Sequence, residues 1–208
     1  MRLFRDFLNV LREHGRTYVL LNIAVYGLLG ATMAVTALSP GLQERGLERA
    51  QAFMEPGPMD FVVSAYVNGD FVSAALGTFI FNLTFAALLT TTIPSLVIPF
   101  FGVAATVYRA MEIGIWLTPT SSDAAIALIP HLPVLIIEFQ AYILATLGTI
   151  ILWRSTFGYQ RLELPSKRAG YRAGLGVNLR LYPVIVLVLF VVAVFEAWEV
   201  IYLIPLLH

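Results

Sequence analysis

The sequence contains no cysteine and few charged residues. Of its 208 residues, 12% are charged and 59% are hydrophobic, and the mean hydropathy is +0.81. The absence of cysteine excludes disulfides, thiolate metal sites and cysteine nucleophiles. A soluble domain needs about a quarter of its residues charged to cover its surface. The composition therefore indicates an integral membrane protein.

Catalytic motifs are missing as well. A hydrolase needs a nucleophile beside a base, or a metal-binding pattern such as HExxH, and neither spacing occurs. We therefore expect no enzymatic activity and no nucleic-acid partner. We expect the protein to lie in the lipid bilayer. We expect no cofactor apart from the possible bound cation considered below.

Five apolar runs are long enough to cross a membrane. A helix rises 1.5 Å per residue, so about 20 residues cross a hydrocarbon core of about 30 Å. The expected spans are residues 17–38, 72–94, 99–117, 133–153 and 181–207. The first span has a stripe of small residues suited to close helix contact: Ala24, Gly27, Ala31 and Ala34. We predict an all-α fold in which residues 1–208 form one polytopic membrane helix bundle.

Residues 1–16 predict an amphipathic helix that lies on the membrane. Its apolar face holds Phe4, Phe7, Leu8 and Leu11. The alternative is an ordinary cytoplasmic extension of the first span.

Arginine and lysine predict the orientation of the chain. They concentrate in residues 2–16 and 154–180, so both segments are expected in the cytoplasm. The acidic segment 39–71 is then external, the N-terminus cytoplasmic and the C-terminus external. Gly170 and Gly174 have GxxxG spacing, but the surrounding arginines favour a cytoplasmic headgroup-binding patch or a loop over a dimer seam.

Pro130 and Pro133 predict a break ahead of the fourth span. Proline disfavours helical geometry in the preceding residue and suits the first turn of a helix. We expect residues 124–129 to form a separate piece and the fourth span to begin near Pro133. Irregular backbone inside a membrane must face protein or water, so the break should face the interior or a cavity.

Polar and ionisable residues interrupt the apolar runs at seven positions: Asn82, Arg109, Glu112, His131, Glu138, Glu196 and Glu199. Counting inward from the external ends of the spans places them in one layer, about 7–16 Å below the surface. Four carboxylates then face Arg109 and, when it is protonated, His131. An ionised side chain at the centre of a lone helix costs about 2.5–3.5 kcal/mol, so the four cannot all be ionised and dry.

Three interpretations of this layer stay open. It is a structural core of Arg–Glu and Glu–His pairs, a cation site, or a path for protons or a solute. The candidate metal ligands are His131, Glu138, Glu196 and Glu199. A water-accessible cavity that reaches Glu138 would favour a carrier or channel, whereas a sealed layer would favour a scaffold.

Four segments share a pattern with a known membrane protein family. They are FIFNLTFAALL (79–89), YRAMEIGIWL (108–117), IPHLPVLIIEFQAYILA (129–145) and FEAWEV (195–200). The pattern resembles the stage II sporulation protein M family, in which an asparagine-bearing helix precedes a proline-histidine-glycine segment and then a glutamate and a small residue. The matching positions here are Asn82, Pro130, His131, Glu138 and Ala141. Leu132 stands where the family commonly has glycine.

The resemblance implies a multi-pass protein of a prokaryotic cell membrane, without established enzymatic activity. It implies a scaffold or assembly component, and we expect a homo-oligomer or a membrane complex. The alternative function is an ion- or proton-coupled transporter or channel that uses the glutamate and histidine residues.

Overall fold

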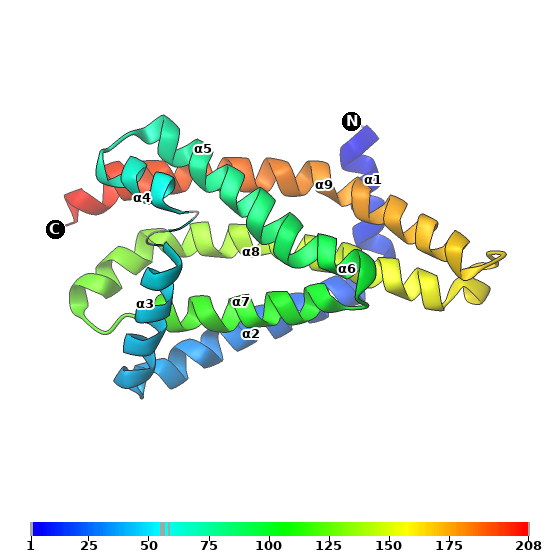
Figure 1. The fold of residues 1–208 in the computed structure, drawn as a ribbon, viewed down its shortest axis with the longest axis horizontal. Coiled ribbons are helices and arrows are strands. Elements are labelled where there is room, and N and C mark those ends of the chain that lie inside the picture. Colours follow the sequence, from blue (N-terminus) through cyan, green and yellow to red (C-terminus); the bar gives the residue numbers. More distant parts are fainter. Residues whose placement is uncertain (1, 55–56, 58, 208) are drawn as a thin grey trace.

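The computed structural model describes residues 2–54, 57 and 59–207, and in this part of the chain every regular element is a helix (Figure 1). The elements are α1 (Arg2–Glu13), α2 (Gly15–Ala37), α3 (Pro40–Met54), α4 (Asp60–Val67), α5 (Phe71–Phe81), η1 (Asn82–Thr92), α6 (Ile93–Val97), α7 (Phe101–Trp116), α8 (Ser122–Phe157), η2 (Tyr159–Leu162), α9 (Lys167–Trp198), η3 (Glu199–Leu203) and η4 (Ile204–Leu206). η1 and η3 are π-helices, and η2 and η4 are 3-10 turns. The predicted all-α class is confirmed.

Four helices are long and apolar enough to cross a membrane: Gly15–Ala37, Phe71–Val97, Ser122–Phe157 and Lys167–Leu206. The predicted third span, 99–117, corresponds to α7, which has only 16 residues and is about 24 Å long at 1.5 Å per residue. α7 still runs along the long axis of the bundle beside α2 (Figure 1). The multi-pass architecture is therefore supported, whereas the count of five spans is not confirmed.

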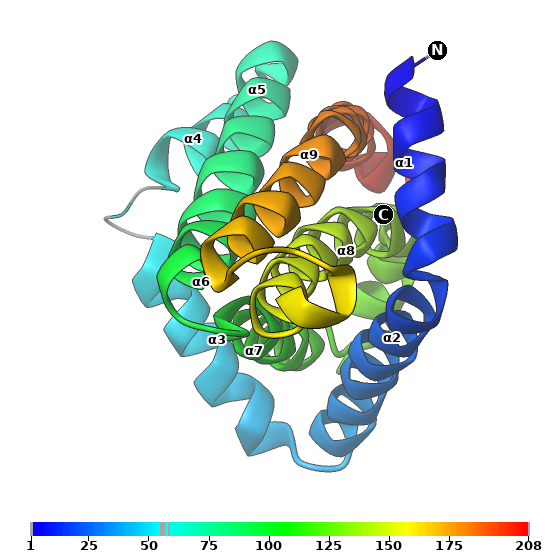
Figure 2. The ribbon, with the colours of Figure 1, turned by 90° about the vertical axis from the view of Figure 1, so that its right-hand side faces the viewer.

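α8 is the central helix of the bundle. In the most apolar stretch of 18 residues of α8, 78% of the residues are buried, whereas the corresponding share is 22–33% in the other three candidate spans. Viewed end-on, α8 is surrounded by α2, α7 and α9 (Figure 2). Its fully buried side chains include Phe139, Tyr142, Ile143 and Leu147. The core of the molecule thus lies around the C-terminal two thirds of α8.

The predicted break at Pro130 and Pro133 is wrong. α8 runs unbroken from Ser122 to Phe157 and includes both prolines. Ser121 caps the helix by accepting a hydrogen bond from the backbone N–H of Ala124 at 3.1 Å, so the helix begins well before the prolines. Proline costs about 3 kcal/mol inside an isolated helix. Transmembrane helices tolerate proline because neighbouring helices and polar side chains satisfy the freed backbone groups.

α8 and α9 are longer than a membrane is thick. At 1.5 Å per residue the 36 residues of α8 extend about 54 Å, whereas the hydrocarbon core is about 30 Å. Both helices extend past the turn between α6 and α7, and η2 connects them at that far end (Figure 1). Most of the expected basic segment 154–180 is thus helical.

Gly170 and Gly174 lie in the contact between α8 and α9. A Cβ atom on Gly174 would be 2.6 Å from the Leu152 Cα, and one on Gly170 would be 2.3 Å from the Ser155 carbonyl oxygen. The alternative of a plain loop was wrong, because both glycines lie inside α9. They allow close approach of two helices within the chain.

α1 runs across the bundle rather than along it (Figures 1 and 2). Val10 is buried, Phe7 and Leu11 pack against the core, and α1 contacts α9 and α2. This placement is the one that a helix on the membrane surface would adopt, although its position relative to a bilayer stays a prediction.

Candidate intramembrane polar cluster

Arg109 is bound mainly by the π-helix η1. Its Nη2 donates to Thr90 Oγ1 at 2.5 Å and to the Ala86 carbonyl oxygen at 3.1 Å, and its Nη1 donates to Thr91 Oγ1 at 3.4 Å. Its Cζ also lies 4.4 Å from the centre of the Tyr142 ring, a cation–π contact. π-helical segments are rare and often occur at functional sites. Here the segment supplies a carbonyl and two hydroxyl groups that solvate a guanidinium.

Glu138 receives its hydrogen bond from within its own helix. The Tyr142 hydroxyl, one turn later on α8, donates to Glu138 Oε1. Tyr142 therefore connects the guanidinium of Arg109, which lies on its ring face, with the carboxyl group of Glu138, at its hydroxyl.

His131 and Glu199 form a contact between α8 and η3. The His131 Nδ1 lies 3.3 Å from Glu199 Oε2, and the Glu199 side chain is fully buried. The second oxygen of Glu199, Oε1, is buried without a hydrogen-bond partner among the described residues.

Glu196 is the least satisfied member of the cluster. Its Oε2 is buried and has no hydrogen-bond partner in the described part of the chain. A buried polar atom without a partner costs about 1–3 kcal/mol.

Tyr66 of α4 borders the same cluster from the predicted external segment. Its hydroxyl lies 3.0 Å from Thr78 Oγ1. Burial raises the pKa of Tyr66, and the neighbouring Glu196 raises that pKa further. The cluster is therefore at the end of the bundle that carries α4 and η3 (Figure 1).

Glu112 and Asn82 were expected in the same layer, but among the described residues neither is hydrogen-bonded or ion-paired to the other members of the cluster. Glu112 lies 3.9 Å from Arg49 of α3, and the Arg49 side chain is 71% exposed. Asn82 is half-buried at the start of η1, and its side chain makes no hydrogen bond to the residues that the structure describes.

The cluster thus combines five expected residues: Arg109, His131, Glu138, Glu196 and Glu199. Tyr142, Tyr66, Thr90 and Thr91 were missed. The run of threonines at residues 90–92 and the tyrosine one turn after Glu138 were the available signals.

The candidate metal ligands do not converge as a ligand set. Across residues 2–54, 57 and 59–207, no group of three or more acidic or histidine side chains is arranged to hold a metal ion. His131 contacts Glu199, and Glu138 contacts Tyr142. Cation binding at this site therefore remains a prediction.

Two pockets are formed at the opposite end of the bundle, and none of the cluster residues lines either of them. Comparisons with known proteins found no protein-family model, no curated protein and no solved structure that matches the chain. The resemblance to the stage II sporulation protein M family therefore stays a prediction that rests on the sequence pattern.

Proposed function

We propose that this protein is a non-enzymatic scaffold or assembly component of a membrane complex, of the stage II sporulation protein M type. The proposed protein crosses a prokaryotic cell membrane five times, with its N-terminus in the cytoplasm and its C-terminus outside. The main support is the way in which the intramembrane polar residues are used. Arg109, His131 and Glu199 each contact a neighbouring helix of the bundle.

Two of these contacts fix helix positions. Arg109 of α7 binds η1 and the Tyr142 ring of α8, so it joins three elements. His131 and Glu199 join α8 to η3. In hydrocarbon, polar contacts of this kind hold helices together because water does not compete for them. A bundle with its helices fixed in this way is suited to present constant surfaces to partners.

The small-residue stripe of the first span supports self-association. Ala24, Gly27, Ala31 and Ala34 are all exposed on the surface of α2. A Cβ atom added at Gly27 would meet nothing within 4 Å. The stripe is therefore open to a helix of a second copy, as in a homo-oligomer.

An ion- or proton-coupled carrier is the second candidate. It is favoured by two buried carboxyl oxygens, Glu196 Oε2 and Glu199 Oε1, which have no hydrogen-bond partner among the described residues. Unsatisfied buried polar groups are uncommon in folded proteins. A bound cation would give these oxygens a partner, and a bound proton would remove the charge of the carboxylate. In a carrier, the cluster would have to gain contact with water at some stage of the cycle.

Reconstitution into liposomes separates the two functions. A scaffold should carry no proton or cation flux, and after mild extraction it should migrate in an assembly larger than its 23.0 kDa chain. Proton or cation flux that is lost in Glu196→Gln but kept in Glu112→Gln would establish the carrier instead. Glu112 is the matched control because its contact is with Arg49, outside the cluster.

A further inference from the structure

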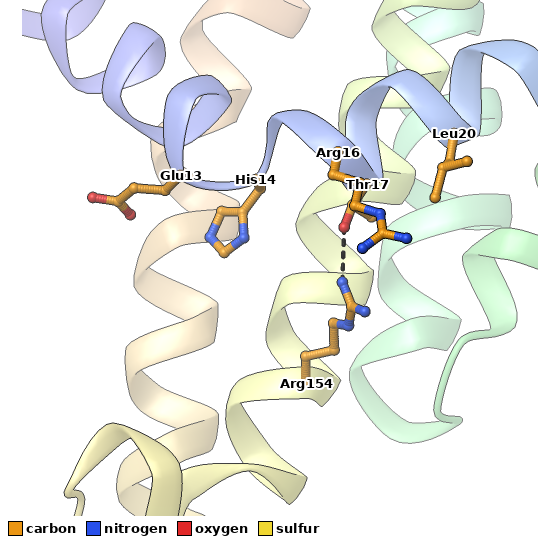
Figure 3. Close-up of a pocket in the computed structure, with 6 residues that line it drawn as sticks. All are labelled: Glu13, His14, Arg16, Thr17, Leu20 and Arg154. Atoms are coloured by element: carbon orange, nitrogen blue, oxygen red, sulfur yellow. Dashed lines mark hydrogen bonds between the residues drawn. The ribbon is translucent and has the colours of Figure 1, made fainter.

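A polar pocket lies where α1 turns into α2 and faces the C-terminal part of α8. Its volume is about 490 Å³, and it is lined by Glu13, His14, Arg16, Thr17, Leu20 and Arg154. Arg154 Nη1 donates to Thr17 Oγ1 at 2.7 Å, which holds the Arg154 guanidinium across the pocket (Figure 3). The Arg16 guanidinium lies on the same side as Arg154, whereas the Glu13 carboxylate points away from both (Figure 3).

An apolar groove continues from this pocket. It has a volume of about 600 Å³ and shares Thr17, Leu20 and Arg154 with the polar pocket. The rest of its lining comes from α7, the residue before α7, and α8: Phe100, Val103, Ala104, Val107 and Ile150. Both volumes fall within the range of about 300–1,000 Å³ that is usual for small-molecule sites.

α2 and α7 approach each other closely at the end of the bundle away from the groove. A Cβ atom on Gly114 of α7 would lie 3.0 Å from the Leu29 carbonyl oxygen of α2. Near Thr17 and Ala104 the two helices instead leave a groove over Ile150 of α8. One site therefore has two charged guanidinium groups at its mouth and an open apolar groove beside them.

We propose that this site binds one anionic phospholipid, with its phosphate beside Arg16 and Arg154 and an acyl chain in the groove. The site lies near the first turns of α2 and α7, where the proposed spans would begin at the cytoplasmic headgroups. Arg16 and Arg154 give the mouth a positive charge, and Thr17 adds a hydroxyl group. Arginine is well suited to phosphate because its planar fork donates two parallel hydrogen bonds.

The combination of features favours a lipid over two other occupants. A free phosphate would need the polar pocket alone and would leave the apolar groove without a role. A helix from a second copy would fill the groove but would not need the arginines. This proposal does not depend on whether the protein is a scaffold or a carrier.

The test is thermal unfolding of the purified protein in a neutral detergent, with phosphatidylglycerol, phosphatidylcholine or glycerol phosphate added. Phosphatidylglycerol should raise the melting temperature in a saturable way, because a ligand that binds only the folded state stabilises it. Phosphatidylcholine should raise it much less, and glycerol phosphate should leave it unchanged. A basic residue near anionic lipid contributes about 1 kcal/mol, so Arg16→Gln should weaken the apparent affinity about fivefold.

Matched variants test the two halves of the site separately. Arg161→Gln removes an exposed arginine of η2 outside the pocket and should keep the wild-type affinity. Ala104→Phe should fill the groove and weaken phosphatidylglycerol binding with no change of charge, whereas Val97→Phe, on the exposed surface of α6, should not.

Four results would overturn the proposal. They are equal stabilisation by the two lipids, full stabilisation by glycerol phosphate, equal losses in Arg16→Gln and Arg161→Gln, and an Ala104→Phe variant that dissociates an oligomer while it binds phosphatidylglycerol normally.

Discussion

Replacing Gly174 by alanine should destabilise the protein, although alanine is the better helix former. A Cβ atom at this position would lie 2.6 Å from the Leu152 Cα, and ordinary Cβ contacts begin near 3.4 Å. Because the obstacle is backbone, no side chain can rotate away, and α8 and α9 must separate by about 0.8 Å. Overpacking costs about 1–3 kcal/mol. Alanine gains about 1 kcal/mol over glycine from helix propensity. With an overpacking cost of about 3 kcal/mol, the free energy of unfolding should fall by about 2 kcal/mol.

Gly176 provides the control on the same helix. A Cβ atom there meets nothing within 4 Å, so Gly176→Ala should keep the propensity gain of about 1 kcal/mol. In a protein of this size 1 kcal/mol corresponds to about 2–4 °C in melting temperature. Unfolding in detergent, followed by the fluorescence of the three tryptophans, should show Gly174→Ala melting about 4–8 °C lower and Gly176→Ala slightly higher than wild type. If both variants shift the same way, the close α8–α9 contact is not the reason for glycine at position 174.

Three further predictions concern topology and polar contacts. Single cysteines in place of Glu48, Thr120 and Gln160 test the span count, since the chain has no native cysteine. If the chain crosses five times, an impermeant thiol reagent outside the cell should label the cysteines at positions 48 and 120. If α7 does not cross, the reagent should label those at positions 48 and 160. The side-chain and backbone hydrogen bonds from Ser73 lower the pKa of the Asp70 carboxyl, which caps α5. The stability that ionised Asp70 adds is therefore present above about pH 4 and lost as the pH falls, so the difference in melting temperature between wild type and Asp70→Ala should shrink between pH 6 and pH 3. Tyr142→Phe removes the donor to a buried carboxyl group and should cost about 1–3 kcal/mol in a denaturant titration; an unchanged midpoint would show that this hydrogen bond is not needed.

Features that depend on composition and run length could be predicted from the sequence. The all-helical class and the long apolar helices follow from the number and order of apolar residues, which the surrounding chain does not alter. The length of α7 depends on its neighbours. Phe100 adopts a left-handed conformation with φ of 60°, which makes the helix begin at Phe101. Gln43 of α3 donates to the Thr118 carbonyl oxygen beyond its other end. Neither the conformation of Phe100 nor the hydrogen bond from Gln43 can be inferred from the length of an apolar run.

The break at Pro130 was predicted with a rule that holds for isolated chains. Proline disfavours helix in the residue before it, but Ser121 begins the helix two turns earlier and neighbouring helices surround its later turns. Local preference was therefore outweighed by the environment of the whole helix.

The sequence predicted only some of the contacts between polar residues. Arg109 and Glu112 are three residues apart, a spacing that puts two side chains on the same side of a regular helix, yet Arg109 contacts η1 and α8 whereas Glu112 contacts α3. The π-helix adds a second difficulty, because its wider turns change the direction of every later side chain relative to a regular helix. Counting residues gives an expected depth in the membrane, but the rotation of a helix about its axis depends on packing.

The carboxyl groups of the cluster are hard to explain by stability alone. Replacing a buried ion pair by apolar residues of similar volume is often neutral or stabilising, so the His131–Glu199 contact is weak evidence that the cluster stabilises the fold. Glu196, with a buried oxygen that has no partner among the described residues, adds a further cost. A scaffold can accept that cost if the polar contacts exclude other helix registers, because only the native arrangement satisfies Arg109 through Ala86, Thr90 and the Tyr142 ring together. On this reasoning, apolar replacement of Glu196 alone should raise stability and leave assembly intact, whereas replacement of Arg109 should allow more than one packing of α7. A stabilised Glu196→Leu variant that no longer assembles would mean that Glu196 contributes to function directly and would favour the carrier.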